Sequence, residues 1–167
     1  MNRIIAVVLT LMAFTAKDVA KLREQTGAGM MDCKKALNET NGNMDEAVEF
    51  LRKNGQAKAE KKASRIAAEG LCMVVTKDDQ TAAVVEVNSE TDFVAKNATF
   101  QEFVKAVATQ AVNSDAADMD AFMAEKWNED ASKTVSEALV EKVAVIGENL
   151  KIRRFEKVVA EHGCVVP

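Results

Sequence analysis

Aromatic side chains are scarce in this sequence. They make up 5% of the residues, with a single tryptophan and no tyrosine. Proteins that bind bases or sugars commonly use aromatic rings as stacking platforms, and this composition offers few of them. The net charge of -4 also opposes general nucleic-acid binding, which needs a basic surface against the phosphates. We therefore expect no direct contact with nucleic acid.

Cysteine and histidine are few and far apart. The cysteines are Cys33, Cys72 and Cys164, and the single histidine is His162. An odd number of widely spaced cysteines, without a C-x-x-C pair, favours neither a disulfide framework nor a zinc site. The expectation is a cytoplasmic protein with reduced thiols, no bound metal and no cofactor.

Motifs for a catalytic nucleophile, a phosphate loop or a dinucleotide site are absent. The sequence has no G-x-S-x-G and no P-loop, and Gly27-Ala28-Gly29 lacks the third glycine of a dinucleotide fingerprint. No spacing argument places a serine or cysteine nucleophile beside His162. The carboxylates show no pairing typical of a hydrolase. These absences favour a protein that works by binding and is not an enzyme.

Residues 1–14 form an apolar extension, with a short hydrophobic run behind Arg3. Its outline is that of a secretory signal, but the run is too short to span a bilayer as a helix. Phe14 stands where a cleavage site would need a small residue. Two interpretations stay open: a signal-like extension, or a true start at Met12 with residues 1–11 upstream of it. We favour the second and expect no membrane association.

The chain has 167 residues, enough for one medium domain or two small ones. Residues 15–54 predict a compact bundle of three short helices, interrupted at Gly27-Ala28-Gly29 and Asn41-Gly42 and ended by Asn54-Gly55. Residues 55–69 are rich in helix formers and basic side chains. They predict a solvent-exposed connecting helix, with a basic face for an acidic partner as the alternative.

Residues 70–167 predict an α+β unit in which helices cover a small three-stranded antiparallel sheet. Apolar runs over Leu71–Thr76 and Ala82–Asn88 flank a short polar loop and predict a hairpin. Alternating apolar and charged residues over Leu150–Val158 predict the third strand. Helical spacing and capping residues predict the covering helices over Phe100–Val112, Met119–Trp127 and Val135–Val145.

A polar and charged stretch, Asn88–Asn97, lies between the second predicted strand and the helix that follows it. Thr91 or Asp92 has the side-chain oxygen that caps a helix start. Phe93 has two interpretations: it packs back onto the helix as a staple, or it points outward as an anchor for a partner. Spacing alone favours the packed position.

Four stretches of this sequence resemble bacterial elongation factor Ts. Residues 22–37, LREQTGAGMMDCKKAL, resemble that family's N-terminal signature, and residues 86–97, EVNSETDFVAKN, resemble its core signature. The basic run over residues 58–65 and the segment 146–155, IGENLKIRRF, are also similar. The four stretches follow one another in the family's order.

The resemblance implies a guanine-nucleotide exchange factor for elongation factor Tu, with a UBA-like helical module at its N-terminus. It implies that Asp92 and Phe93 press on the GTPase near the magnesium of bound GDP, while Thr91 and Val94 hold the loop. With this resemblance, the outward interpretation of Phe93 becomes the favoured one.

A second contact with elongation factor Tu is implied for Met30, Met31 and Lys34. Methionine adapts well at binding surfaces, but packing inside the bundle is an equal alternative for Met30. Short members of the family act as dimers, so a second copy of the chain is a further candidate partner. Long members continue into a second subdomain, so we expect the unit over residues 70–167 to be truncated.

Two other classes of function stay open. A UBA-like interaction module, or an inactive fragment, would rely on residues 15–54 and leave the stretch around Phe93 without a purpose. A thiol enzyme would use Cys33, but this residue lies on the apolar face of a predicted helix, which indicates a buried and inert thiol.

Overall fold

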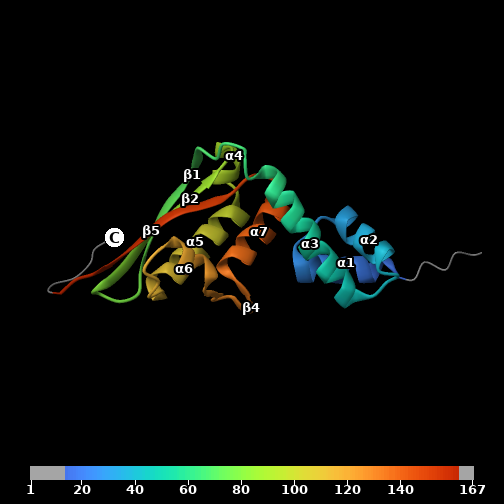
Figure 1. The fold of residues 1–167 in the computed structure, drawn as a ribbon, viewed down its shortest axis with the longest axis horizontal. Helices are drawn as coiled ribbons and strands as arrows, with labels where there is room; N and C mark the ends of the chain where they lie inside the picture. The colour runs from blue at the N-terminus through green and yellow to red at the C-terminus, as the bar shows by residue number, and fades with distance from the viewer. Residues whose placement is uncertain (1–13, 162–167) are drawn as a thin grey trace, which may run out of the picture. The chain divides into compact units, whose positions relative to one another are not determined.

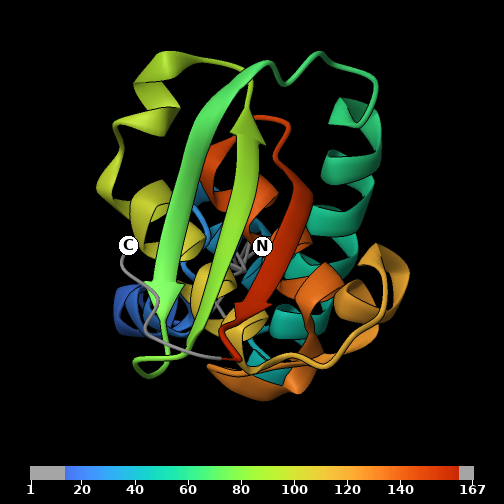
Figure 2. The ribbon, with the colours of Figure 1, turned by 90° about the vertical axis from the view of Figure 1, so that its left-hand side faces the viewer.

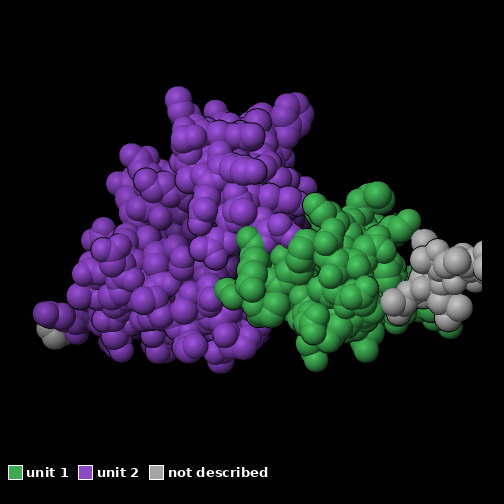
Figure 3. Space-filling view, turned by 45° about the vertical axis from the view of Figure 1, so that its right-hand side comes forward, with its two compact units in different colours: residues 1–53 green, residues 54–167 purple. Residues whose placement is uncertain are grey.

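The structure is a computed structural model that describes residues 14–161. Nearly all of the apolar extension lies outside the described residues, as do His162 and Cys164. The chain divides into two compact units, residues 1–53 and residues 54–167 (Figure 3). In the described range, no helix is long and apolar enough to cross a membrane.

The first unit is built from three helices, as the sequence predicts. They are α1 (Ala16–Thr26), α2 (Met30–Glu39) and the first part of α3 (Met44–Lys62) (Figure 1). Thr15 starts α1 with a capping box to Asp18. Side chains from all three helices form the core, together with Phe14: Val19, Leu22, Cys33, Ala36, Leu37 and Ala47.

The predicted helix end at Asn54-Gly55 is wrong, because α3 continues without a break to Lys62. Glycine costs a helix about 1 kcal/mol relative to alanine, but packing can override that preference. A Cβ at Gly55 would lie 3.4 Å from the Cβ of Ala144, so this turn of α3 packs against α7 (Val135–Ile146). The connecting helix predicted over residues 55–69 is therefore the second half of α3, and strand β1 already begins at Glu69.

The second unit contains the predicted three-stranded antiparallel sheet. Strands β1 (Glu69–Thr76), β2 (Thr81–Ser89) and β5 (Lys151–Val159) pair in the order β1-β2-β5. Val85 in the middle strand lies opposite Met73 on one side and Phe155 on the other. The α+β class and the sheet that the sequence predicts are confirmed.

Helices cover one face of this sheet, and Figure 2 shows the three strands in front of them. The central helix is α5 (Ala98–Asn113), which packs against β1 and β2, and α6 (Met119–Ala124) and α7 complete the layer. Val85 and Val87 of β2 are buried against this layer, whereas Val84 points to the exposed face. The largest buried side chains of the helices are Phe100, Phe103, Val104, Val107, Phe122 and Val135.

The helix predicted over Met119–Trp127 ends early, at Ala124. A short ribbon of β3 (Lys126–Trp127) and β4 (Asp130–Thr134) follows it, and the sequence does not predict this ribbon. Gln110 of α5 fixes the chain there: its amide donates to the carboxylate of Glu125 at 2.9 Å and accepts from the backbone of Asn128 at 2.9 Å. Tertiary hydrogen bonds thus override the helical spacing of this segment.

Candidate partner-binding site

The polar stretch after β2 forms a single helical turn before the main helix. This turn is α4 (Asp92–Ala95), and Thr91 caps it by accepting a hydrogen bond from the backbone of Val94 at 3.4 Å. Asn97 then caps α5, accepting from the backbone of Thr99 at 2.8 Å. Of the two caps that the sequence allows, the structure therefore uses Thr91 for α4.

Phe93 points away from the protein and is 82% exposed. Ala95 is buried and Val94 is half-buried, so the short helix turns these residues toward the core and Phe93 toward solvent. The packed position that spacing alone favours is wrong, because the ring points to solvent; its role as an anchor for a partner stays a prediction. A large exposed aromatic ring on a folded surface is a candidate anchor for a partner.

Asp92 carries a negative charge next to this ring. The ammonium group of Lys96 lies 2.7 Å from its carboxylate, one helical turn away. The hydrogen bond from Lys96 holds the pKa of the Asp92 carboxyl below its ordinary value, and Asp92 in turn raises the pKa of Lys96. The pair thus stays charged at neutral pH and is lost as the pH falls through the lowered pKa of Asp92 or rises through the raised pKa of Lys96. Both side chains are exposed, so we assign the pair a small role in stability.

The loop that carries Phe93 is tied to the segment that follows α7. One carboxylate oxygen of Glu148 accepts from the backbone amides of Glu90 and Thr91, both at 3.1 Å. Its other oxygen accepts from the hydroxyl of Thr91 at 2.7 Å. Three hydrogen bonds therefore converge on one side chain that is 57 or 58 positions away in the sequence.

Glu90, in turn, binds the backbone of the segment that contains Glu148. Its carboxylate accepts from the backbone amide of Asn149 at 2.6 Å, and the guanidinium of Arg65 lies 3.5 Å from the same oxygen. The side-chain amide of Asn149 donates to the backbone carbonyl of Arg65 at 2.8 Å. Three distant segments thus meet at the base of the loop.

Met30, Met31 and Lys34 lie on α2 in the first unit. Met30 is 58% exposed and Met31 is 75% exposed, and Lys34 is also exposed. The alternative that Met30 packs inside the bundle is therefore wrong. The three positions are separated by one, three and four residues, so they lie on neighbouring parts of the helix surface.

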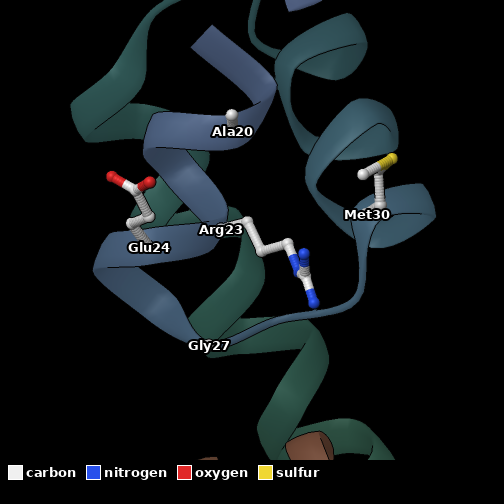
Figure 4. A pocket seen from close by; sticks show the side chains of 5 residues that line it. All are labelled: Ala20, Arg23, Glu24, Gly27 and Met30. Carbon is white, nitrogen blue, oxygen red and sulfur yellow. The ribbon is translucent and has the colours of Figure 1, made fainter. Parts of the chain in front are cut away.

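A hollow of about 290 Å³ lies beside this surface, between α1 and the start of α2 (Figure 4). Arg23 and Glu24 of α1 line it together with Gly27 and Met30. The hollow offers an apolar methionine edge and one charge of each sign within the first unit.

Cys33 is fully buried in the same unit, as the sequence predicts. Burial raises the pKa of its thiol, which keeps the thiol protonated at neutral pH. This environment opposes the use of Cys33 as a nucleophile. Residues 14–161 also contain no cluster of three or more histidine, cysteine, aspartate or glutamate side chains that could hold a metal ion.

The sequence does not identify Glu148, Glu90, Asn149 or Arg65 as parts of the site. The first three lie within stretches quoted for the family resemblance, and Arg65 ends the basic run. A local signal for Glu148 does exist, because Gly147 ends α7 in the left-handed conformation with φ of 86° and fixes where the next residue begins. The partner of its carboxylate, however, depends on long-range packing.

Comparisons with known proteins point to one family. The family described as Elongation factor TS matches residues 90–166. A protein named Elongation factor Ts from Clostridium novyi is 53% identical over 152 residues, which are 90% of this chain and 50% of the relative. One from Trichlorobacter lovleyi is 52% identical over 155 residues, or 92% of this chain and 50% of the relative.

A third relative of the same name, from Thioalkalivibrio sulfidiphilus, is 52% identical over 153 residues, 91% of this chain and 51% of its own length. The chain thus spans about half the length of the curated relatives that it matches. Through these matches, the chain is a partial match to elongation factor Ts, similar to it over most of its own length.

Proposed function

We propose that this chain is a translation elongation factor that acts as a guanine-nucleotide exchange factor. In this proposal it binds elongation factor Tu in its GDP-bound and nucleotide-free states in the cytoplasm. The observation that carries the proposal is Phe93, which is 82% exposed and stands on a capped helical turn with a hydrogen-bonded base. The relatives are named Elongation factor Ts, and the resemblance to that family implies the partner.

The proposed action needs no chemistry on the nucleotide. Mg2+ requires near-ideal octahedral ligands, including phosphate oxygens, and it neutralises much of the charge on those phosphates. Phe93 and Asp92 would press on the GTPase beside this ion, with Thr91 and Val94 holding the loop. When the coordination of the ion is disturbed, the phosphates lose stabilisation and GDP leaves.

Exchange then follows from differential binding. A factor that binds the nucleotide-free state more tightly than the nucleotide-bound state lowers the affinity for GDP, and GDP lowers the affinity for the factor by the same ratio. The exposed Met30, Met31 and Lys34 in the first unit are the proposed second contact with elongation factor Tu. Two separate contacts would hold the loop against its target for longer than one.

Release of a fluorescent GDP analogue from elongation factor Tu, with and without the chain, tests the proposal. We expect faster release in proportion to the concentration of the chain until the complex saturates. Titration calorimetry of the chain with nucleotide-free elongation factor Tu measures the binding affinity. A chain that binds with no effect on GDP release would retain the partner but exclude the exchange function, and a chain that does not bind would exclude both.

A further inference from the structure

We propose that Glu148 is a positioning residue that sets the pose of Phe93, and that Glu90 completes this device from the opposite side. The inference rests on the proposed function for its effect on GDP release. Its structural part concerns the free chain alone. The two acids form a reciprocal clamp, in which each carboxylate accepts from backbone amides of the other's segment.

The clamp is defined by four hydrogen bonds between two segments that are far apart in the sequence. Glu148 accepts from the amides of Glu90 and Thr91 at 3.1 Å and from the Thr91 hydroxyl at 2.7 Å. Glu90 accepts from the amide of Asn149 at 2.6 Å. Hydrogen bonds to carboxylates are stronger than those between neutral groups, so the loop and the end of α7 are held in register.

The position of the clamp explains why it bears on Phe93. Thr91 is both the cap of α4 and the residue with two of the three hydrogen bonds to Glu148. Phe93 follows two residues later on a helix of a single turn, which has too few internal hydrogen bonds to hold its own direction. The direction of the ring therefore depends on how firmly Thr91 is fixed.

The C-terminal side of the clamp is fixed by the main fold. Helix α7 packs against α5, and its cap at Gly147 turns the chain directly before Glu148. Strand β5 starts at Lys151, so only a few residues connect the clamp to the sheet. Glu148 thus connects the loop to the end of a helix that packs in the core.

Substitutions separate the hydrogen bonds from the charge. Glu148→Ala removes both acceptor oxygens and with them all three hydrogen bonds, so the backbone amides of Glu90 and Thr91 and the Thr91 hydroxyl lose their partner. Glu148→Gln keeps one acceptor oxygen for the amides, and its NH2 group can donate to the Thr91 hydroxyl oxygen. The control is Glu156→Ala, because Glu156 is an exposed acid on β5, away from the loop.

Amide hydrogen exchange in the free chain, followed by NMR, tests the structural part. We expect the amides of Glu90 and Thr91 to be protected in the natural sequence and to lose protection by roughly tenfold or more in Glu148→Ala. Glu148→Gln should retain most of this protection, and Glu156→Ala should retain all of it. Unchanged protection in Glu148→Ala would overturn the inference, whatever happens with elongation factor Tu.

GDP release tests the functional part through a double-mutant cycle with Phe93. We expect Glu148→Ala alone to slow release by roughly tenfold. In the Phe93→Ala background, at concentrations where release is still accelerated, Glu148→Ala should add little. An equal slowing in both backgrounds would contradict a role through Phe93. If the natural chain does not accelerate release at all, the proposed function fails, and hydrogen exchange alone decides whether the clamp exists.

Discussion

Phe93 combines a high exposure with a fixed backbone, and this combination is unusual for a large apolar side chain. Leaving a phenylalanine ring in water forgoes about 1.5–3 kcal/mol of burial free energy. The loop around it is nevertheless well ordered by hydrogen bonds, with Thr91 as cap and Glu148 as acceptor. A fold that holds an exposed ring in this way is suited to present it to a partner.

The outward direction of Phe93 could not be read from spacing, which is consistent with a helix staple as well. The difference comes from the chain around it: α4 is only one turn long, and Asn97 starts a separate helix. The core face of α5 is filled by its own residues, such as Phe100 and Val104. The local sequence pattern alone does not predict which side chains fill the core and which, like Phe93, stay exposed.

Met31 and Lys34 provide a test of the second contact at the residue scale. Alanine at either position removes an exposed side chain from α2, where alanine is a favourable helix residue. We expect weaker binding to nucleotide-free elongation factor Tu, by roughly threefold to thirtyfold, and unfolding free energies within about 0.5 kcal/mol of the natural chain. Normal affinity by titration calorimetry in both variants would count against this contact.

Cys33 should be chemically inert in the folded chain. Its thiol is buried and its pKa is raised, so little reactive thiolate is present at neutral pH. In a variant with Cys72→Ser and Cys164→Ser, we expect reaction with a thiol reagent to be slow in buffer and fast in denaturant. Rapid modification in buffer would contradict the burial and reopen the possibility of a thiol enzyme.

At the scale of elements, periodicity predicts the helices and strands that have a clear apolar face. The spacing in Phe100–Val112 corresponds to α5, and the alternation in Leu150–Val158 corresponds to β5. The boundaries are less predictable where packing opposes local preference. Helix α3 passes through Gly55, and the β3–β4 ribbon replaces the last turn of a predicted helix.

The start of β1 depends on Gly70, which gives a test of the sheet. Its φ is 143°, and a Cβ there would lie 2.2 Å from the backbone carbonyl oxygen of Val87 in β2. We expect Gly70→Ala to lower the free energy of unfolding by about 2 kcal/mol or more, because both the backbone conformation and the contact become strained.

Gly29→Ala is the matched control for this experiment. Gly29 has an extended backbone, and the nearest atom to an added Cβ is a side-chain oxygen of Asp32 at 3.7 Å. Urea denaturation of the two variants should show a small change for Gly29→Ala and a large loss for Gly70→Ala. Equal stabilities would contradict the close approach of β1 to β2.

For the whole molecule, the sequence predicts the class and the two-part composition better than it predicts the site. Binary patterning identifies the helical N-terminal region and the α+β region. The domain bounds 15–54, 55–69 and 70–167 stay predictions, although α3 runs across the boundary between residues 54 and 55. The sequence does not predict the clamp between Glu90 and Glu148, because these two residues lie 58 positions apart in the chain and meet only through long-range packing.

The chain spans about half the length of its curated relatives, and the activity of this part is therefore the central question. The proposed loop lies wholly within the part that is present. A homodimer would raise the affinity by linking two copies, and the apparent mass in solution at several concentrations would reveal it.

The rate of fluorescent-GDP release from elongation factor Tu in the presence of Phe93→Ala tests the central claim most directly. We expect release to be at least roughly thirtyfold slower than with the natural chain, because a dominant aromatic anchor contributes about 2 kcal/mol or more. The stability of the variant should be unchanged, since the ring is 82% exposed. The control is Val158→Ala, because Val158 is an exposed apolar residue at the far end of β5. This variant should accelerate the release of GDP from elongation factor Tu as much as the natural chain does. Release by Phe93→Ala at the rate of the natural chain would contradict the account.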